Sequence, residues 1–200
     1  MDRKKNISDC DDHALIRRTL DGEKEAFSEL VRRYQGRAYG VAVGIVGNRD
    51  DALDVVQESF VKAYSALKDF RFDAKFYTWF YRLLINKAID KKREVSRNPG
   101  TAFDETWMMA DDGFPTGSSE FYERPDETAG RRELRDIMHE AIESLTEHHR
   151  TVILLREVEG MSYQEIADVL DISIGTVMSR IHYGKEKLRE LLSEYVRGNR

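Results

Sequence analysis

The stretch MSYQEIADVLDISIGTVMSRIHYGKEKL, residues 161–188, has the pattern of two short helices joined by a tight turn. Ser162 and Glu165 form an S-x-x-E capping box, which starts a helix. Asp171 occupies the turn, where we expect a left-handed backbone, and Asp tolerates that conformation better than most residues. Ser173 is placed to cap the second helix. These offsets together predict a helix-turn-helix.

The second helix of this motif would present a polar and basic face to a partner. Ile166, Ala167 and Leu170 give the first helix an apolar face, while Val177 and Ile181 anchor the second. The outward residues would then be Thr176, Met178, Ser179, Arg180, His182, Tyr183 and Lys185. Such a helix fits the major groove of DNA. The alternative is an ordinary helical hairpin with a solvated face.

Composition narrows the class of protein. The 200 residues are 40% hydrophobic and carry a net charge of −5, which argues against a protein that coats nucleic acid through bulk charge. The single cysteine, Cys10, excludes an intramolecular disulfide and a multi-cysteine zinc site. The sequence has no apolar run long enough for a membrane span and no signal-peptide pattern at its start, so a cytoplasmic location is expected.

Charge is unevenly distributed along the chain. Residues 68–93 hold eight basic and three acidic side chains, whereas residues 96–130 hold two basic and eight acidic ones. The acidic block is also interrupted by Pro, Gly and Ser, which is typical of a flexible linker. Apolar residues elsewhere recur with helical spacing. We therefore expect an all-α chain with helical domains at 12–95 and 131–196, joined by an acidic linker at 96–130.

Individual helices follow from this spacing and from capping signals. Two helices are expected between Asp12 and Ile45, broken near Asp21-Gly22, because a Gly there interrupts the apolar pattern. Asn48 followed by Asp51 is a plausible helix start. The further predicted helices are Asp51–Leu67, a long one from the 68–75 junction through Lys92, Arg131–Leu145, Glu147–Val158 capped by Thr146 and ended at Gly160, Ser162–Leu170, and Ile174 to about Val196.

A second informative stretch, FRFDAKFYTWFYRLLINKAIDKKR at residues 70–93, mixes aromatic rings with cations. Its apolar residues are mostly expected in the core, namely Trp79, Phe80, Leu83, Leu84, Ala88 and Ile89. A second set lies at the helix junction and suits unstacked bases held over phosphates: Phe70, Arg71, Phe72, Lys75 and Tyr77. Asn86 is polar within an apolar turn; its amide would read a base edge or cap a neighbouring loop.

With these motifs in order, the chain resembles the extracytoplasmic-function (ECF) sigma factors, and within them the envelope-stress subgroup called sigma E in enteric bacteria. The resemblance rests on DALDVVQESFVKAYSAL at 51–67, FRFDAKFYTWFYRLLINKAID at 70–90 and a helix-turn-helix of the type LSYQEIA…GTV.SR, in which Met161 replaces Leu. It covers about residues 12–95 and 131–192. Such proteins are RNA polymerase subunits that supply promoter recognition.

The resemblance implies a role for each segment. Residues 68–77 match the loop that captures a flipped base of the −10 element, and Asn86 matches a position lining that pocket. The helix at 51–67 matches the segment that binds the clamp of the largest polymerase subunit, with Asp51, Asp54, Gln57, Glu58 and Lys62 as contacts; a solvated charge face is the alternative. Arg150 and the recognition helix, including Ser173, match the −35 reader. The linker matches the segment that runs through the polymerase.

The resemblance further implies an anti-sigma factor as a partner, alongside core polymerase and promoter DNA. The chain departs from the family at Met178, where a basic residue is usual, and at Tyr183-Gly184, where Arg-Ala is usual. At those positions the promoter preference of the family is not carried over to this chain.

Two other function classes fit the sequence less well. A dimeric helix-turn-helix repressor or activator would bind a palindrome without polymerase, and it does not suit the long linker or the basic aromatic junction. An enzyme would need a converging set of catalytic groups. His13 near Asp11 and Asp12, and His148-His149 near Glu147, lack such a set. We expect no enzymatic activity, no cofactor and no metal.

Overall fold

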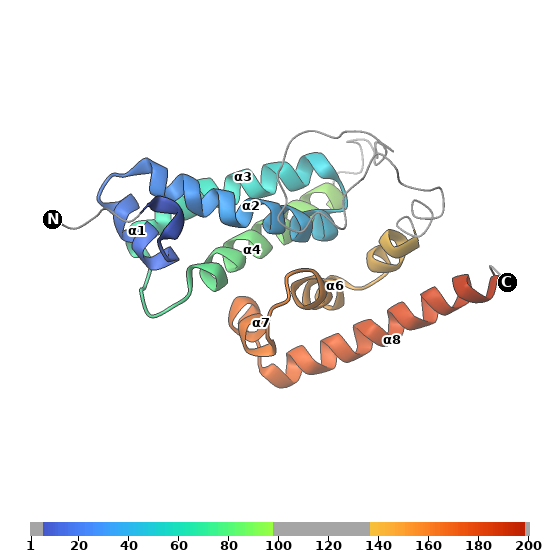
Figure 1. Cartoon of the computed structure of the whole chain (residues 1–200). Helices are drawn as coiled ribbons and strands as arrows, with labels where there is room; N and C mark the ends of the chain where they lie inside the picture. The colour runs from blue at the N-terminus through green and yellow to red at the C-terminus, as the bar shows by residue number, and fades with distance from the viewer. Residues whose placement is uncertain (1–5, 98–136, 199–200) are drawn as a thin grey trace.

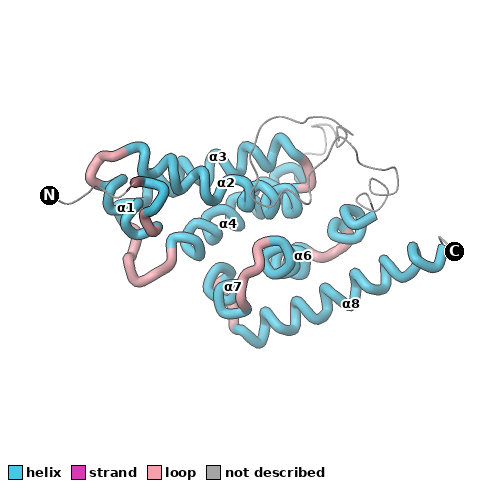
Figure 2. Tube along the Cα trace, in the orientation of Figure 1, coloured by secondary structure: helices cyan, strands magenta, loops and turns pink. Residues whose placement is uncertain are grey.

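The computed structural model describes residues 6–97 and 137–198, and in both ranges the secondary structure is helical (Figure 1). Four helices form an N-terminal half, and the helices after residue 136 form a C-terminal half that lies beside it. The all-α prediction is confirmed. Tubes coloured by secondary structure show helices joined by short loops in the described ranges (Figure 2). Most of the predicted linker, from residue 98 on, lies outside the described residues.

The N-terminal half packs one amphipathic helix against the next. Its helices are α1 (Asp12–Leu20), α2 (Lys24–Val46), α3 (Arg49–Ala66) and α4 (Phe76–Arg97), with the 3-10 turn η2 (Leu67–Asp69) before the loop that leads into α4. Leu15, Leu30, Val55, Phe80 and Leu84 are fully buried between them. Each such side chain contributes about 1.5–3 kcal/mol on burial.

Local signals set the helix ends in this half. The Asn48 side chain accepts a hydrogen bond from the Asp51 backbone N–H at 2.9 Å, which confirms the predicted start of α3. Gly47 ends α2 with φ of 93°, a left-handed conformation that Gly adopts without steric cost.

The C-terminal half contains the predicted helix-turn-helix. Residues 137–143 are helical, followed by α6 (Glu147–Ile153), the π-helical turn η4 (Leu154–Val158), α7 (Tyr163–Leu170) and α8 (Ile174–Gly198). Both predicted caps are present: the Ser162–Glu165 capping box is reciprocal, and Thr146 caps α6. Asp171 has φ of 54°, as expected for the turn. These local contacts fix the angle between α7 and α8.

The two halves dock on each other through α2 and α4. α7 packs on α4, while α6 and η4 pack on α2. Gly44 of α2 permits this approach, since a Cβ there would lie 2.6 Å from Leu154 Cδ2. Three ion pairs join the halves, Lys75–Glu165 at 2.9 Å, Lys92–Glu143 at 3.1 Å and Arg93–Glu147 at 2.9 Å. The local spacing of residues in the sequence does not predict this docking.

No helix in the described ranges is both long and apolar enough to cross a membrane.

Candidate nucleic-acid interface

The loop between η2 and α4 carries a cluster of aromatic rings. Phe70 is only 5% exposed and packs edge-on against Trp79, with ring centroids 5.3 Å apart. Phe72 is 38% exposed and lies edge-on to Phe70 at 5.4 Å. The structure therefore separates two rings that the sequence grouped together. Phe70 supports the loop from the core, and Phe72 is the ring presented to solvent.

The polar residues predicted beside these rings have different environments. Arg71 is exposed and pairs with Asp73 at 2.7 Å on the loop itself. Lys75 pairs with Glu165 of α7 at 2.9 Å, and the Tyr77 hydroxyl donates to Glu159 Oε2 at 3.3 Å. Both of these partners belong to the C-terminal half. The docked halves thus occupy two of the predicted strand-binding residues.

Further along α4, Asn86 is exposed, one helical turn after Arg82. The Arg82 guanidinium donates to the backbone carbonyl of Asp168 in α7. The reading of Asn86 as a loop cap finds no support, because none of the side-chain hydrogen bonds among the described residues involves it. Arg82 was not predicted as a site residue from the sequence. It lies on the same face of α4 as Asn86, and it contacts α7.

Glu159 is an unusual buried carboxyl group at this junction. It is 9% exposed, and its Oε1 and the neighbouring Tyr81 hydroxyl have no hydrogen-bond partner among the described residues. Burial raises the pKa of Glu159 to about 7, although Tyr81, Arg37 and Tyr77 oppose the shift. Since loss of hydration disfavours the charged form, Glu159 takes up a proton more readily here than an exposed carboxyl group does.

Glu165 behaves in the opposite way. The Ser162 backbone N–H donates to its carboxylate, and Lys75 pairs with it, so the pKa of Glu165 falls to about 2. Glu165 therefore stays ionised at any physiological pH. The Glu165 carboxylate thus caps the N-terminus of α7 and also pairs the C-terminal half with the loop before α4.

The recognition helix α8 presents the predicted outward face. Val177 and Ile181 are buried against the rest of the domain, as predicted, while Met178 and Tyr183 are 54% and 59% exposed. Ser173 Oγ accepts from the Thr176 backbone N–H at 3.1 Å, which confirms the expected cap. The remaining predicted contacts lie at or partly at the surface: Thr176, Ser179, Arg180, His182 and Lys185. His182 lies 3.5 Å from Glu186, and Lys185 pairs with Glu157 at 2.8 Å.

Arg150, which the sequence placed in the −35 reader, needs a correction. It is 5% exposed, and its guanidinium donates to the backbone carbonyls of Ile142, Glu143 and Leu145. Ile142 and Glu143 end the 137–143 helix, and Leu145 follows it. Arg150 therefore joins two helices of the C-terminal half instead of facing DNA. A fork of several N–H donors suits this task, because it can satisfy several carbonyls at once.

The predicted polymerase-binding face of α3 is partly tied up within the domain. Asp51 pairs with Lys91 at 3.0 Å, and Glu58 pairs with Lys87, so both carboxylates also hold α3 to α4. Asp54, Gln57 and Lys62 are exposed. The structure thus leaves three of the five predicted side chains freely presented on this face.

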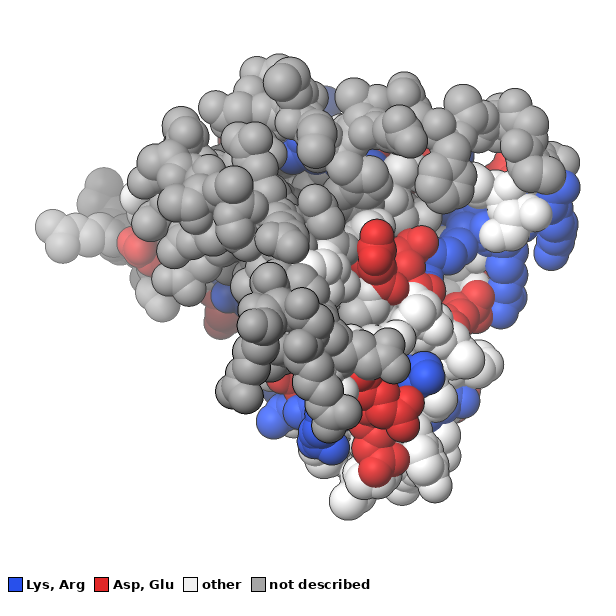
Figure 3. All heavy atoms as spheres, turned by 90° about the vertical axis from the view of Figure 1, so that its right-hand side faces the viewer, with Lys and Arg blue, Asp and Glu red and all other residues white. Residues whose placement is uncertain are grey.

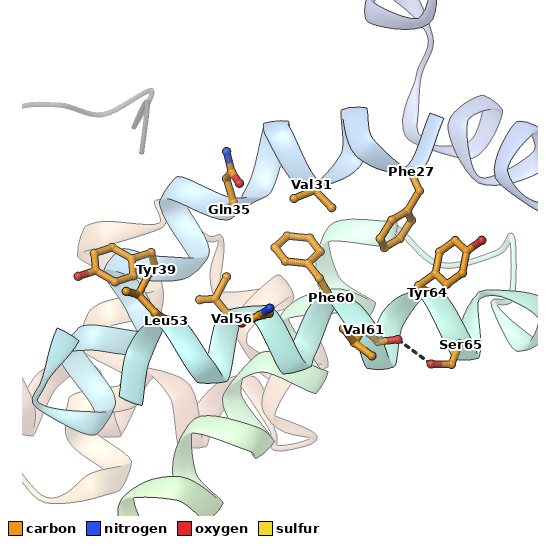
Figure 4. Close-up of a pocket in the computed structure, with 11 residues that line it drawn as sticks. Phe27, Val31, Gln35, Tyr39, Leu53, Val56, Phe60, Val61, Tyr64 and Ser65 are labelled. Carbon is orange, nitrogen blue, oxygen red and sulfur yellow. Dashed lines mark hydrogen bonds between the residues drawn. The ribbon is translucent and has the colours of Figure 1, made fainter. Parts of the chain in front are cut away.

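Beside these residues lies an apolar groove of about 660 Å³ between α2 and α3 (Figure 4). Phe27 of α2 and Phe60 and Tyr64 of α3 line it, with the Phe27 and Tyr64 ring centroids 4.9 Å apart. Val61 is 63% exposed at its rim and Leu53 is 38% exposed. This groove was not predicted from the sequence, although Leu53, Val61 and Tyr64 are apolar residues on the polar side of the predicted helix.

Charge on the molecule is mixed. Viewed from the end where α8 terminates, acidic and basic side chains lie next to one another over the described surface (Figure 3). Lys92 and Arg93 of α4, and Lys75 just before it, pair with acidic residues of the C-terminal half in this arrangement. Within the described residues, no group of three His, Cys, Asp or Glu side chains could hold a metal ion.

Comparison with known proteins gives matches across both halves. The family model for sigma-70 region 2 matches residues 30–98, and the model for sigma-70 region 4 matches residues 135–188. The RNA polymerase sigma-H factor of Pseudomonas aeruginosa is 38% identical over 190 residues, covering 93% of this chain and 96% of that protein. The ECF RNA polymerase sigma-E factor of Escherichia coli is also 38% identical, with the same coverage of each chain, over 186 residues.

Two solved structures have a similar fold. CnrH, determined in complex with the cytosolic domain of CnrY, gives a TM-score of 0.68 at 29% identity and covers 92% of this chain and 97% of its own. The sigma factor RpoE of Bartonella quintana, determined with the anti-sigma factor NepR, gives a TM-score of 0.62 at 23% identity and covers 84% and 96%.

Proposed function

The chain belongs to the ECF sigma factors of the sigma-70 family, which direct RNA polymerase to promoters, and we propose that it reads a promoter with two separate surfaces. The loop before α4, together with Asn86, captures one strand of the −10 element. The exposed face of α8 reads the −35 element as intact duplex. Contact with core polymerase is made through α3. The chain would work in the cytoplasm, where its polymerase partner is.

The exposure of Phe72, Arg71 and Asn86 supports strand capture at the first surface. Flipping a base from the stack costs a few kcal/mol. Stacking on an aromatic ring returns about 1–3 kcal/mol per base, and phosphate contacts add more. Because these contributions nearly balance, one captured base can nucleate opening, while the free protein does not melt a duplex by itself. Polymerase supplies the remaining free energy.

The geometry of α8 supports duplex reading at the second surface. The Ser173 cap and the buried Val177 and Ile181 hold the helix rigidly against its domain. Its outward side chains include Arg180 and Ser179, which can donate to base edges in a major groove. Met178 and Tyr183 add apolar contact area at positions where the family resemblance implies basic residues, so we expect this reader to favour a different base pattern and fewer phosphate contacts.

The groove between α2 and α3 supports the polymerase contact. An exposed apolar face rimmed by polar residues is typical of a protein interface. We propose that a helix of the polymerase clamp covers Val61 and Leu53, with Gln57 and Lys62 at the polar edge. This places the contact slightly to one side of the set predicted from the sequence, because Asp51 and Glu58 are engaged by lysines of α4.

Promoter reading on this scheme requires the halves to separate. In the docked arrangement Lys75, Tyr77 and Arg82 contact the C-terminal half. These are cations and a ring on the face that would meet the −10 strand. We propose that the docked form is the resting form and that polymerase binding releases α4 for DNA.

An anti-sigma factor is the second expected protein partner. The RpoE structure contains the anti-sigma factor NepR, and the similar fold supports the same kind of partner here. Such a partner would hold the two halves in an arrangement in which the loop before α4 and helix α8 cannot bind the −10 and −35 elements.

The observation that carries the proposal is the presence of both readers, in family order, with the exposed residues described above. The test is reconstitution: purified chain is mixed with sigma-free core polymerase and a promoter library, and transcripts are sequenced. We expect initiation from a set of promoters that share a −10 and a −35 element. Failure to join core enzyme, or joining without initiation at any promoter, would refute the proposal. Tight palindrome binding by a homodimer would indicate a repressor or activator.

A further inference from the structure

The first helix of the chain contacts the strand-capture loop directly. Helix α1 lies before residue 30, where the matched region 2 model begins. His13 of α1 lies against the loop residues Phe70, Phe72 and Ala74. The two segments are about sixty residues apart in the sequence. This contact shapes the one loop that the proposed function needs to be exposed and ordered.

His13 holds the loop by one hydrogen bond and two ring contacts. Its Nε2 lies 3.0 Å from the Ala74 carbonyl oxygen. Since a carbonyl only accepts, the ring nitrogen donates, which requires a proton on Nε2. The imidazole also meets Phe70 and Phe72 edge-on, with centroids at 5.9 and 5.6 Å. The loop is itself a tight turn, in which the Ala74 N–H donates to the Arg71 carbonyl at 3.0 Å.

Arg17 reaches the same loop from the next turn of the helix. Its guanidinium carbon lies 4.9 Å from the centroid of the Phe72 ring, a cation–π distance. Residues at i and i+4 share one helix face, so His13 and Arg17 point to the loop together. Arg17 is exposed, and within residues 6–97 and 137–198 it forms no salt bridge. A positive charge is thus placed beside the exposed ring without a carboxylate to neutralise it.

Helix α1 is a rigid base for these two side chains. Asp11 caps it by accepting from the Ala14 N–H at 2.7 Å, and Leu15 and Ile16 are fully buried. On its other side, Asp12 accepts from Arg33 at 3.1 Å and from the Tyr34 hydroxyl. The acidic residues that flank His13 are therefore engaged in holding the helix, and they do not form a metal site with it.

We propose that α1 forms a wall of the strand-capture site, in which His13 is a positioning residue for the 70–75 loop and Arg17 contacts a phosphate of the strand that Phe72 binds. The proposal rests on the proposed function of that loop. His13 acts by keeping Phe72 and Arg71 in place before DNA arrives. Arg17 acts on the DNA itself, because its cation lies over one face of the ring that would hold a base and forms no salt bridge among the described residues.

The test for His13 compares His13→Ala with His13→Gln in reconstituted holoenzyme. The Gln side chain can place an amide N–H near the position of Nε2, so it keeps the donor and loses the ring. We expect His13→Ala to lower promoter opening, measured by permanganate reactivity, about fivefold, as for loss of one net hydrogen bond, with duplex binding unchanged. His13→Gln should recover much of the opening. Equal opening by all three proteins, or a loss that His13→Gln does not reduce, would overturn the positioning role.

The test for Arg17 measures binding of a single-stranded −10 oligonucleotide to holoenzyme over a range of salt concentrations. Losing one phosphate contact should reduce the slope of log K against log salt by about 0.7 for Arg17→Ala. Arg17→Lys should keep the slope, and Lys24→Ala, which removes an exposed cation of α2, should leave both affinity and slope unchanged. An unchanged slope in Arg17→Ala would overturn the phosphate contact.

The outcomes also distinguish a failure of the role of α1 from a failure of the proposed promoter-reading function. If wild-type holoenzyme opens promoters and the His13 and Arg17 variants match it, only the role of α1 is refuted. If the wild-type holoenzyme opens no promoter, the proposed function fails and this inference fails with it. Melting temperatures of the variants, measured on the free chain, identify any loss that comes from unfolding.

Discussion

Substituting Glu159 by Gln should lock the two halves of this protein together. Glu159 is buried where η4 and the following turn of the C-terminal half meet α4 of the N-terminal half. The groups that face it are Arg37 from α2 and the Tyr77 and Tyr81 hydroxyls from α4. Burial raises its pKa from 4.5 to about 7 in the docked form, and separation would expose the carboxylate and return its pKa to the ordinary value.

The direction and size of the effect follow from linkage. Because the pKa is raised in the docked form, docking is fully favoured below about pH 4.5 and is weakened as pH rises to about 7. The pKa difference corresponds to about 3 kcal/mol, or roughly two orders of magnitude in the ratio of docked to separated forms. Between pH 6 and pH 8 the wild-type ratio should fall about tenfold. Gln resembles the protonated acid, so Glu159→Gln should stay docked throughout this range.

Energy transfer between dyes on the two halves measures this ratio. Dyes attached at Lys24→Cys and Lys187→Cys report separation, and Cys10 is buried away from the label. Glu157→Gln is the matched control, since Glu157 is exposed and pairs with Lys185 inside its own domain. Glu165, with a pKa of about 2, does not titrate in this window.

In wild type and the control, transfer should decline from pH 6 to pH 8. In Glu159→Gln it should stay high, and assembly with core polymerase at pH 8 should slow. If Glu159→Gln and wild type show the same pH profile, then Glu159 does not govern docking and the reasoning is refuted.

Four further substitutions test three surfaces and one buried residue. Asn86→Ala should weaken promoter opening more than duplex binding, and equal effects in permanganate and gel-shift assays would remove it from the capture pocket. Arg180→Ala should lower promoter affinity and reduce the salt slope by about one, measured by filter binding. Arg150→Ala should cost roughly 3 kcal/mol in a denaturant titration, because three backbone carbonyls lose their donor, and Arg150→Lys should not restore it. Val61→Glu should leave the melting temperature nearly unchanged but weaken core polymerase binding about tenfold in a pull-down titration; unchanged binding would remove the groove from that interface.

Features of the chain that depend on near neighbours were readable from the sequence. The capping box of Ser162 and Glu165, the left-handed Asp171 and the Asn48 cap each involve residues within four positions of one another. Such contacts form wherever the local spacing is right, so the helix-turn-helix and most helix boundaries could be predicted. The outward residues of α8 followed from period 3.6 alone.

Contacts between distant residues were decided only by the tertiary structure. Phe70 and Phe72 look equivalent in sequence, yet one is buried and the other is presented, because α1 and α4 enclose only one side of the loop. Arg150 looked like a DNA contact until the carbonyls after residue 141 were brought to it. Glu159 gave no signal in the sequence, since its burial comes from a helix about eighty residues away.

The sequence by itself determined that the chain is helical, that it carries a helix-turn-helix and that its family is that of the sigma factors, because capping, periodicity and motif order are written in short stretches. The tertiary structure decided how the halves dock, where the groove between α2 and α3 lies and how α1 contacts the 70–75 loop. They depend on which side chains from separate helices pack against one another and on how completely that packing excludes water. The spacing of residues within a short stretch specifies neither.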